Sequence, residues 1–373
     1  MFVISHFKPL DVLTAIAVVF KSIGRVMIKT INSWRGLMAV VVVSFHSGFV
    51  CLWNLTYSGV TFFFISSAFL LSARHPFDRL TKSDYKNFVY GHAMRLYPLN
   101  WLALGLMIAL ALGFHSATVN WGATALTALL VQSWSPVHDV HYGLNPVAWF
   151  MSALLFCYVA YPFLAHWVGH WRLGPKALLT AVMVLVMGLI LVPLDAEGRE
   201  IMFVNPLVHV VDFTVGILLY HIYKVLKEKN LQISFGIATL VEVSLLLLLA
   251  LTVVATVKTT WFKPWEDDLL WLLPQGAILV ALTLFNGREG AVGRVLLWRP
   301  LQWLGSISYE VFMLQFVAFH LFNYVLSPVA GHFGVLIYDL KTLCVWLVLL
   351  PLAWLVNRYF TRPISAYFKR RIK

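Results

Sequence analysis

Residues 33–50, SWRGLMAVVVVSFHSGFV, form an apolar run with an arginine near its start and a histidine near its centre. A helix rises 1.5 Å per residue, so about 20 residues cross roughly 30 Å of bilayer hydrocarbon. Ionisable side chains are costly at that depth, and those that occur there usually have a function. The run therefore predicts a membrane-spanning helix, with Arg35 and His46 as its first candidate functional residues.

Comparable apolar runs recur along the whole chain. Of its 373 residues, 60% are hydrophobic and only 12% are charged, whereas globular domains carry about 25% charged residues. The composition predicts an all-α fold, a polytopic transmembrane helix bundle, with residues 31–373 as a single domain. Including the first run (33–53), eleven segments stand out, near residues 33–53, 56–73, 96–114, 119–134, 145–166, 176–194, 201–223, 232–257, 269–286, 301–324 and 335–357.

The segment near 119–134, NWGATALTALLVQSW, is short and bounded by polar residues. If it does not cross, ten spans remain, both termini are cytosolic, and 24 of the 28 Lys and Arg residues lie on the cytosolic side. If it crosses, the basic residues divide 14 against 14. Cytosolic loops are enriched in Lys and Arg, which selects ten spans. The fourth segment is then predicted to be a re-entrant or interfacial helix on the outer side.

Composition also bears on the remaining parts of the chain. The net charge of +12 lies in short loops, where membrane orientation explains it better than nucleic-acid binding does. Residues 1–30 form an extension with no signal-peptide cleavage pattern. Either it is an amphipathic helix on the membrane surface, or the residues before Met27 come from an upstream start codon. Cys51, Cys157 and Cys344 show no paired spacing and are predicted to be buried thiols.

Arg35 and His46 are eleven residues apart, which places both on one face of a helix and about 16 Å apart along its axis. Histidine exchanges a proton near neutral pH and suits a general base, whereas arginine stays charged and binds phosphate or carboxylate. For each residue alone, an equally good interpretation is structural: Arg35 as a membrane anchor and His46 as an interhelical hydrogen-bonding residue.

Five motifs in order give the chain a resemblance to the acyltransferase-3 family of integral membrane acyltransferases. The Arg35 and His46 spacing is the first. The others are FFFISSAF (62–69), with Phe63, Phe64, Ser67 and Phe69; MRLYPLNW (94–101), with Arg95, Tyr97 and Pro98; the helix NPVAWFMSALLFCYVAYPFL (145–164), with Trp149, Ser152, Tyr158 and Pro162; and LQWLGSISYEVFMLQ (301–315), with Leu304, Gly305, Ser308 and Tyr309. The match runs from about residue 30 to the C-terminus.

The resemblance implies transfer of an acyl group, often acetyl, from cytosolic acyl-CoA to a hydroxyl or amine of a glycan, a lipid-linked saccharide or another small acceptor. It also implies location in a bacterial cytoplasmic (inner) membrane. Ala68 replaces the family's glycine, Leu154 stands where many members carry Glu, and Gln315 stands where many carry His. The last two departures leave details of substrate and acceptor open.

The resemblance and the residue chemistry together assign roles. We expect His46, Arg35 and Glu310 to be catalytic, with His46 as the general base. The expected donor contacts are Arg35, Arg95, Ser67 and Tyr97, helped by basic residues of a cytosolic loop over 74–95. Arg95 is expected at a helix entry beside Pro98. An equally good interpretation of the other basic residues is that they only set the membrane topology; these are Arg74, Arg79, Lys82 and Lys86. The expected acceptor contacts are Trp149, Ser152, Tyr309 and Gln315.

Other polar residues within the spans are assigned less specific roles. His209 and Asp212 lie three residues apart on one helix face, and a local hydrogen-bonded pair is a better interpretation than a general-base pair. Glu310 is expected to pair with Arg35, Arg95 or His46, and ranks above Glu242. Ser66 and Ser67 are expected mainly at a helix contact. Near 138–141, His138, Asp139 and His141 are weak evidence for a metal, so we expect no metal site.

Two other functions compete with the acyltransferase. An exporter of a lipid-linked or acylated saccharide would use the same buried Arg and His, but such transporters commonly contain internal repeats, and none is evident. A catalytically idle scaffold draws support only from Leu154 and Gln315. The acyl chain, the acceptor, the side on which the acceptor is modified and the oligomeric state stay open.

Overall fold

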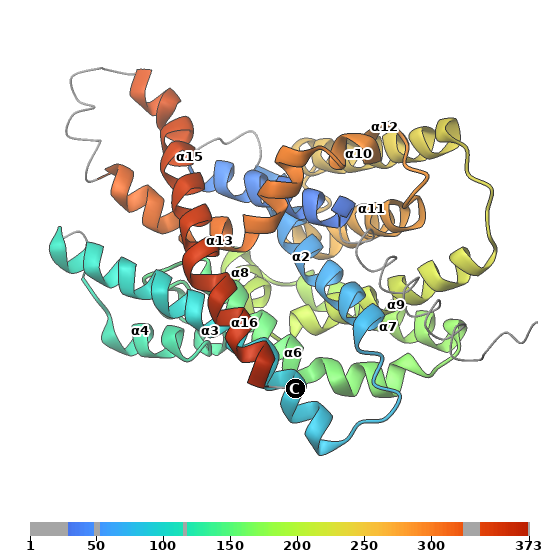
Figure 1. Ribbon diagram of the computed structural model, residues 1–373, viewed down its shortest axis with the longest axis horizontal. Coiled ribbons are helices and arrows are strands. Elements are labelled where there is room, and N and C mark those ends of the chain that lie inside the picture. Colours follow the sequence, from blue (N-terminus) through green and yellow to red (C-terminus); the bar gives the residue numbers. More distant parts are fainter. Residues whose placement is uncertain (1–28, 48–52, 115–117, 324–335, 372–373) are drawn as a thin grey trace, which may run out of the picture.

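The computed structural model describes residues 29–47, 53–114, 118–323 and 336–371, and within them it contains helices and no strand (Figure 1). The predicted extension, apart from residues 29 and 30, and Cys51 lie outside the described residues. The α-helices cover residues 29–46, then α2 (Trp53–Arg74), α3 (Lys82–Gly113), α4 (Trp121–Ala128), α5 (His138–His141), α6 (Ala148–Gly169), α7 (Leu173–Leu191), α8 (Ala196–Val204), α9 (Val208–Glu228), α10 (Phe235–Lys258), α11 (Leu272–Leu284), α12 (Ala291–Leu296), α13 (Arg299–Leu321), α15 (Leu336–Val356) and α16 (Arg362–Arg371).

Eight of these helices are long and apolar enough to cross a membrane. They correspond to eight of the ten predicted spans. The other two predicted spans coincide with the helix over 29–46 and with the shorter apolar helix Leu269–Leu284, made of η4 (Leu269–Trp271) and α11. The predicted all-α polytopic bundle is confirmed.

The short segment near 119–134 contains only α4 and the single turn η2 (Gln132–Trp134). Eight residues reach about 12 Å, too short to cross. Three side chains of α3 hold its C-terminal carbonyls: the Tyr97 hydroxyl donates to Leu129 O at 3.0 Å, Asn100 Nδ2 to Thr127 O at 2.9 Å and Trp101 Nε1 to Ala128 O at 2.8 Å. These bonds satisfy backbone groups that a helix end leaves open.

Two predicted boundaries were wrong. The expected loop over 74–95 is helical from Lys82, where Thr81 accepts a hydrogen bond from Asp84 N as an N-cap, so Arg95 lies within α3 and not at a helix entry. The predicted span 201–223 is broken into α8 and α9. Pro206 follows the end of α8, and the Asn205 side chain accepts from Leu207 N in a turn.

Burial divides the helices into a centre and a periphery. In the apolar window of α2, 83% of residues are buried inside the protein, against 11% in α7 and 17% in α10. The outward faces of α7 and α10 carry exposed leucines such as Leu189 and Leu251, as expected of helices that face lipid. The helix over 29–46 lies among the central helices (Figure 1).

Small residues allow the central helices to approach closely. A Cβ on Gly36 would lie 2.8 Å from the backbone nitrogen of Gly305 in α13, and one on Gly216 of α9 would lie 2.5 Å from Ile65 O of α2. Glycine removes the side chain that would keep the two backbones apart. These contacts fix the helix over 29–46 against α13, and α2 against α9.

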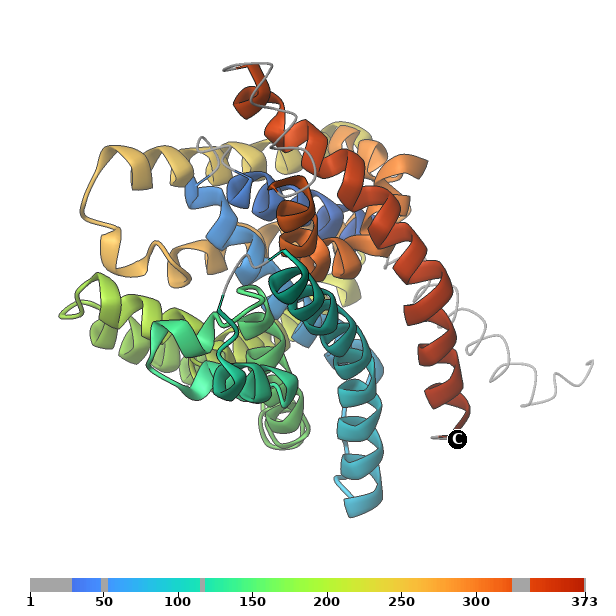
Figure 2. The same ribbon diagram turned by 90° about the vertical axis from the view of Figure 1, so that its left-hand side faces the viewer.

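The C-terminal part forms one long helical rod. α15 continues through the π-helical turn η6 (Asn357–Thr361) into α16. α16 packs against the N-terminal half of α3, and the two helices extend toward the same end of the molecule (Figure 2). This is the end that the distribution of basic residues assigns to the cytosol.

Candidate functional site

His46 is oriented by Gln315 across the contact between the helix over 29–46 and α13. Gln315 Nε2 donates to Phe312 O at 2.8 Å, which leaves Gln315 Oε1 as the acceptor 2.8 Å from His46 Nδ1. His46 Nδ1 therefore carries the proton, and the lone pair is on Nε2. Gln315 therefore holds the imidazole in this tautomer, and its predicted contact with the acceptor stays a prediction.

We predict that Gln315→Met, which keeps the length of the side chain and removes the acceptor, lowers kcat by about tenfold to a hundredfold with a smaller change in KM. The physical reason is that the imidazole loses the partner that fixes its tautomer and direction. Steady-state kinetics of acyl transfer measure the effect. An unchanged kcat would remove Gln315 from the positioning of His46.

His46 lines a cavity of about 350 Å³, which we call the His46 chamber. Its walls come from the helix over 29–46, from α2, α6 and α13, and from the segments that hold Tyr142 and Phe203. The lining is largely apolar and aromatic: Val42, Phe45, Tyr57, Val60, Tyr142, Pro146, Val147, Trp149, Phe203, Phe312 and Phe316, with Thr56 and His138. Aromatic faces next to a few polar groups suit a ligand with both apolar and hydroxylated faces.

A second cavity of about 680 Å³ opens at the end of the molecule where α3 and α16 meet, and we call it the basic chamber. Arg35, Arg74, Arg79 and Arg95 line it, with Asp84 as the acidic member of the lining. The pKa of His75, at its rim, is lowered by burial and by the charge of Arg74. The chamber is therefore strongly positive.

None of these four arginines forms an ion pair with a carboxylate among the described residues. Arg35 Nε is buried without a hydrogen-bond partner there, and its guanidinium lies 5.7 Å from the centre of the Phe63 ring. Unpaired guanidinium groups around one cavity form a site for a polyanion such as a phosphorylated cofactor.

A third cavity of about 530 Å³, the Glu310 chamber, adjoins the basic chamber and shares Arg35, His92, Arg95, Tyr158 and Ser365 with it. The Glu310 carboxylate accepts a hydrogen bond from Asn357 Nδ2 at 2.9 Å. Among the described residues it has no ion pair with Arg35, Arg95 or His46, so the predicted pairing was wrong. Leu154 lines this chamber, at the position where the family often carries Glu. In this protein the chamber has the carboxylate of Glu310, which lies in α13.

Some of the other predicted contact residues line these cavities, and others do not. Ser67 lines the basic chamber, and its hydroxyl donates to Phe63 O at 2.6 Å. Tyr309 lines the Glu310 chamber, and Trp149 the His46 chamber. Ser152 is buried, and its hydroxyl has no partner among the described residues. Tyr97 is not among the described lining residues of the three chambers, because its hydroxyl holds α4, and its donor contact stays a prediction.

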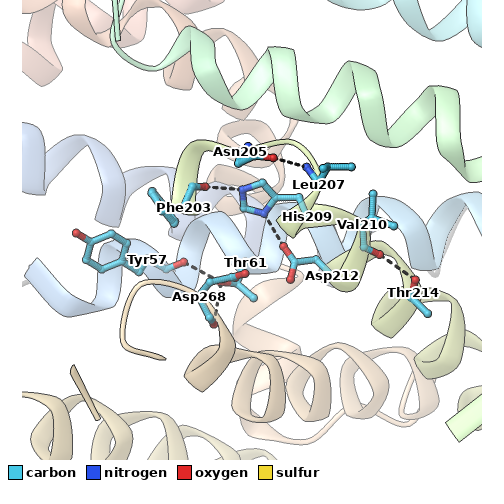
Figure 3. Close-up of polar contacts among 10 residues, drawn as sticks. All are labelled: Tyr57, Thr61, Phe203, Asn205, Leu207, His209, Val210, Asp212, Thr214 and Asp268. Atoms are coloured by element: carbon cyan, nitrogen blue, oxygen red, sulfur yellow. Dashed lines mark hydrogen bonds and ion pairs between the residues drawn. The ribbon is translucent and has the colours of Figure 1, made fainter. Parts of the chain in front are cut away.

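A buried polar cluster of His209, Asp212 and Asp268 lies next to Phe203 (Figure 3). His209 also stacks on Trp149, and both Phe203 and Trp149 line the His46 chamber. His209 Nε2 donates to Phe203 O at 2.7 Å, and His209 Nδ1 is 2.7 Å from Asp212 Oδ2. The break after α8 exposes the Phe203 carbonyl to this bond. The predicted hydrogen-bonded pair is thus present, and it has a third member that the sequence did not indicate.

The His209 ring also supports the aromatic wall. It stacks on Phe64 with ring centres 3.9 Å apart and on Trp149 with ring centres 5.7 Å apart. Thr61 donates to Asp268 Oδ1 at 2.8 Å, and burial together with Asp212 raises the pKa of Asp268. The cluster therefore holds Trp149 and Phe203, two lining residues of the His46 chamber, in place.

The three side chains of this cluster place potential ligand atoms within 4.8 Å of one another. Two ligands of one transition-metal ion, each about 2.1 Å from it, are about 3 Å or more apart. The 2.7 Å between His209 Nδ1 and Asp212 Oδ2 is instead a hydrogen-bond distance. The geometry favours a hydrogen bond between His209 and Asp212 over coordination of a metal ion by both side chains.

The histidines of the outer loop lie near the expected Asp139 and near a second acid, Glu200. His138 Nδ1 is 3.3 Å from Asp139 Oδ1, and His138 Nε2 and His141 Nε2 lie 3.4 and 3.5 Å from Glu200 Oε1. Nearby, burial and the charge of Glu266 raise the pKa of Asp267 to about 6. These groups form the polar rim on the His138 and Tyr142 side of the His46 chamber.

Three lining residues were missed by sequence reasoning. His92 is three residues before Arg95, so both share a helix face once α3 is known to begin at Lys82. Tyr158, in the fourth motif, lines both the basic and Glu310 chambers. Asn357, which binds Glu310, lies in the π-helical turn, and no sequence signal marked it.

The fold and the cavities define a polytopic helical membrane protein with an arginine-lined cavity at one end and a histidine-containing cavity toward the other. The acyltransferase domain family, acyltransferase-3, matches residues 28–360. The chain belongs to this family and is a membrane acyltransferase. Searches against curated proteins and solved structures gave no match.

Proposed function

We propose that this protein transfers an acetyl group from acetyl-CoA to a hydroxyl of a cell-envelope glycan or lipid-linked saccharide, with His46 as the general base. The observation that carries the proposal is the arrangement of two cavities. Four arginines that have no ion pair among the described residues face one of them, and a histidine oriented by Gln315 faces the other. An acyl-CoA is a polyanion with an uncharged reactive end, so its two ends match the two environments.

The donor is proposed to bind with its phosphates in the basic chamber. Arg35, Arg74, Arg79 and Arg95 supply the positive charge, and α16 closes one side through Ser365 and Phe368. Guanidinium groups form bidentate hydrogen bonds to phosphate oxygens. The distribution of Lys and Arg supports a cytosolic position for this chamber, on the side where acyl-CoA is present.

The acceptor is proposed to bind in the His46 chamber. His46 Nε2 takes the proton of the acceptor hydroxyl as its oxygen attacks the thioester carbonyl. The new C–O bond forms, the C–S bond breaks, and the proton passes from the imidazolium to the departing thiolate, giving free CoA. Trp149, Tyr57 and Phe203 supply flat apolar faces for a sugar ring, and the cluster next to them keeps those faces in place.

Labelled transfer tests the proposal. Membranes containing the protein are incubated with acetyl-labelled acetyl-CoA and a crude extract of glycans and lipid-linked glycans, and both CoA release and label in the extract are followed. We expect label to enter a saccharide fraction in proportion to CoA release. Absence of transfer with any short-chain acyl-CoA would refute the proposed reaction.

We predict that Arg95→Ala raises the KM for acetyl-CoA about tenfold while kcat changes less, because a phosphate contact contributes to binding of the donor throughout the reaction. The effect should shrink at high salt, which screens the same interaction. Arg172→Ala, an exposed cation at the start of α7, is the matched control. Equal KM values for the two variants would contradict the assignment of Arg95.

A further inference from the structure

The basic and Glu310 chambers share no lining residue with the His46 chamber. Arg35 lines the first two, and His46 lines the third. The eleven helical steps from Arg35 to His46 separate the two residues by about 16 Å along the helix axis. A donor held at Arg35 therefore reaches His46 only by passing through the protein that lies between the chambers.

Three phenylalanines from three helices occupy that region. Phe63 of α2, Phe150 of α6 and Phe312 of α13 are 4, 5 and 4% exposed. Their ring centres are 5.9 Å apart for Phe63 and Phe150, 5.9 Å for Phe63 and Phe312, and 5.2 Å for Phe150 and Phe312. Each ring contacts both others at the distances preferred by aromatic pairs. We call these three residues the aromatic partition.

The partition touches the chambers on both sides. Phe150 lines the Glu310 chamber, and the Arg35 guanidinium lies over the ring of Phe63. Phe312 lines the His46 chamber, and its carbonyl accepts the hydrogen bond from Gln315, the residue that orients His46. Two rings in contact, Phe150 and Phe312, thus lie between the chamber that contains Arg35 and the chamber that contains His46.

We propose that Phe63, Phe150 and Phe312 form the passage for the acyl-pantetheine arm, closed until the donor inserts, and that they keep water of the basic chamber away from His46. This inference rests on the proposed function. We expect the donor to open this passage by displacing the rings, because each ring is held by packing and by no hydrogen bond. The rings are thereby further donor-contacting residues of the site.

An open passage has a chemical cost. Water that reaches the thioester beside His46 replaces the acceptor hydroxyl: a C–O bond forms to water, the C–S bond breaks, and acetic acid and free CoA leave. Exclusion of water from an active site prevents this side reaction. The partition therefore couples CoA release to acyl transfer.

Thiol labelling tests the barrier without any acceptor. In a chain with Cys51, Cys157 and Cys344 replaced by alanine, Thr56→Cys places one thiol in the His46 chamber. In sealed vesicles of known orientation, we expect a membrane-impermeant maleimide to label it only from the side opposite the basic chamber. Phe312→Ala, or Phe150→Ala as a second variant, should make it reactive from both sides. Phe285→Ala, a buried phenylalanine outside the three chambers, is the control for loss of an aromatic side chain.

CoA release in the absence of acceptor is the second readout. We expect Phe312→Ala and Phe150→Ala to raise it about tenfold over the parent protein and over Phe285→Ala. Adding His46→Ala should abolish that increase.

Labelling of the parent thiol from both sides, or one-sided labelling in both partition variants, would overturn the proposal. Failure of the proposed function gives a different result. The parent thiol would still be labelled from one side only and the partition variants from both sides, but His46→Ala would leave acyl transfer unchanged.

Discussion

His46→Ala should lower the rate of acyl transfer by about 10² to 10⁴, the usual contribution of a positioned general base. The effect should fall mainly on kcat, because a general base acts on the proton that is transferred in the transition state and contributes little to binding of the donor. Its Nδ1 is fixed by Gln315 at 2.8 Å, so the lost group is a base already in its working tautomer. Steady-state rates with acetyl-CoA measure the loss.

The control for this substitution is His221→Ala. His221 is half-buried on α9, binds Ile217 O through Nδ1, and is not among the described lining residues of the three chambers. This variant should retain the parent rate. If His46→Ala retains it too, His46 has the structural role that its sequence position alone equally allowed.

Gly305→Ala should be the most damaging small substitution for stability. A Cβ there would collide with the carbonyl oxygen of Asn32, and one on Gly36 would meet Gly305 N at 2.8 Å. Both obstacles are backbone, which cannot rotate away, so the helix over 29–46 must move from α13. Overpacking typically costs about 1–3 kcal/mol, and a clash with rigid backbone places this substitution at the upper end of that range. A lower unfolding temperature in detergent and reduced abundance in membranes are the expected results.

The matched control is Gly105→Ala in α3, where a Cβ would meet nothing within 4 Å. It should leave the unfolding temperature unchanged or slightly higher, because alanine has the better helix propensity. The same unfolding temperature for Gly305→Ala and Gly105→Ala would show that the two helices do not approach as closely as described. Because this contact also positions Arg35 and His46, Gly305→Ala should lose activity together with stability.

Much of the fold could be predicted because membrane length and charge bias act along the sequence. The all-α bundle and the short fourth segment followed from apolar run lengths and from the placement of Lys and Arg. Helix ends followed less well. The extension of α3 to Lys82 depends on an N-cap at Thr81 within a polar stretch, and the break before α9 depends on Pro206 inside an apolar run. In both places a local signal outweighed the hydropathy pattern.

The site could be predicted only in part. Helical spacing put Arg35 and His46 on one face, but it did not show that they face different chambers. The partners of Glu310 and Gln315 lie 47 and 269 residues away, and Asp268 joins His209 and Asp212 from a separate loop. Such contacts arise from tertiary packing, which no local pattern encodes. Assignment of each site residue to donor or acceptor stays a prediction.

We propose that the donor binds on the side of the basic chamber and that its acyl group reaches the acceptor at His46. Sealed vesicles of single orientation test it most directly, with labelled acetyl-CoA supplied to one side only and acceptor extract to the other. We predict transfer when the donor is on the side of the basic chamber, none when donor and acceptor exchange sides, and none with His46→Ala. Transfer that proceeds equally from either side, or that persists without His46, would contradict the account.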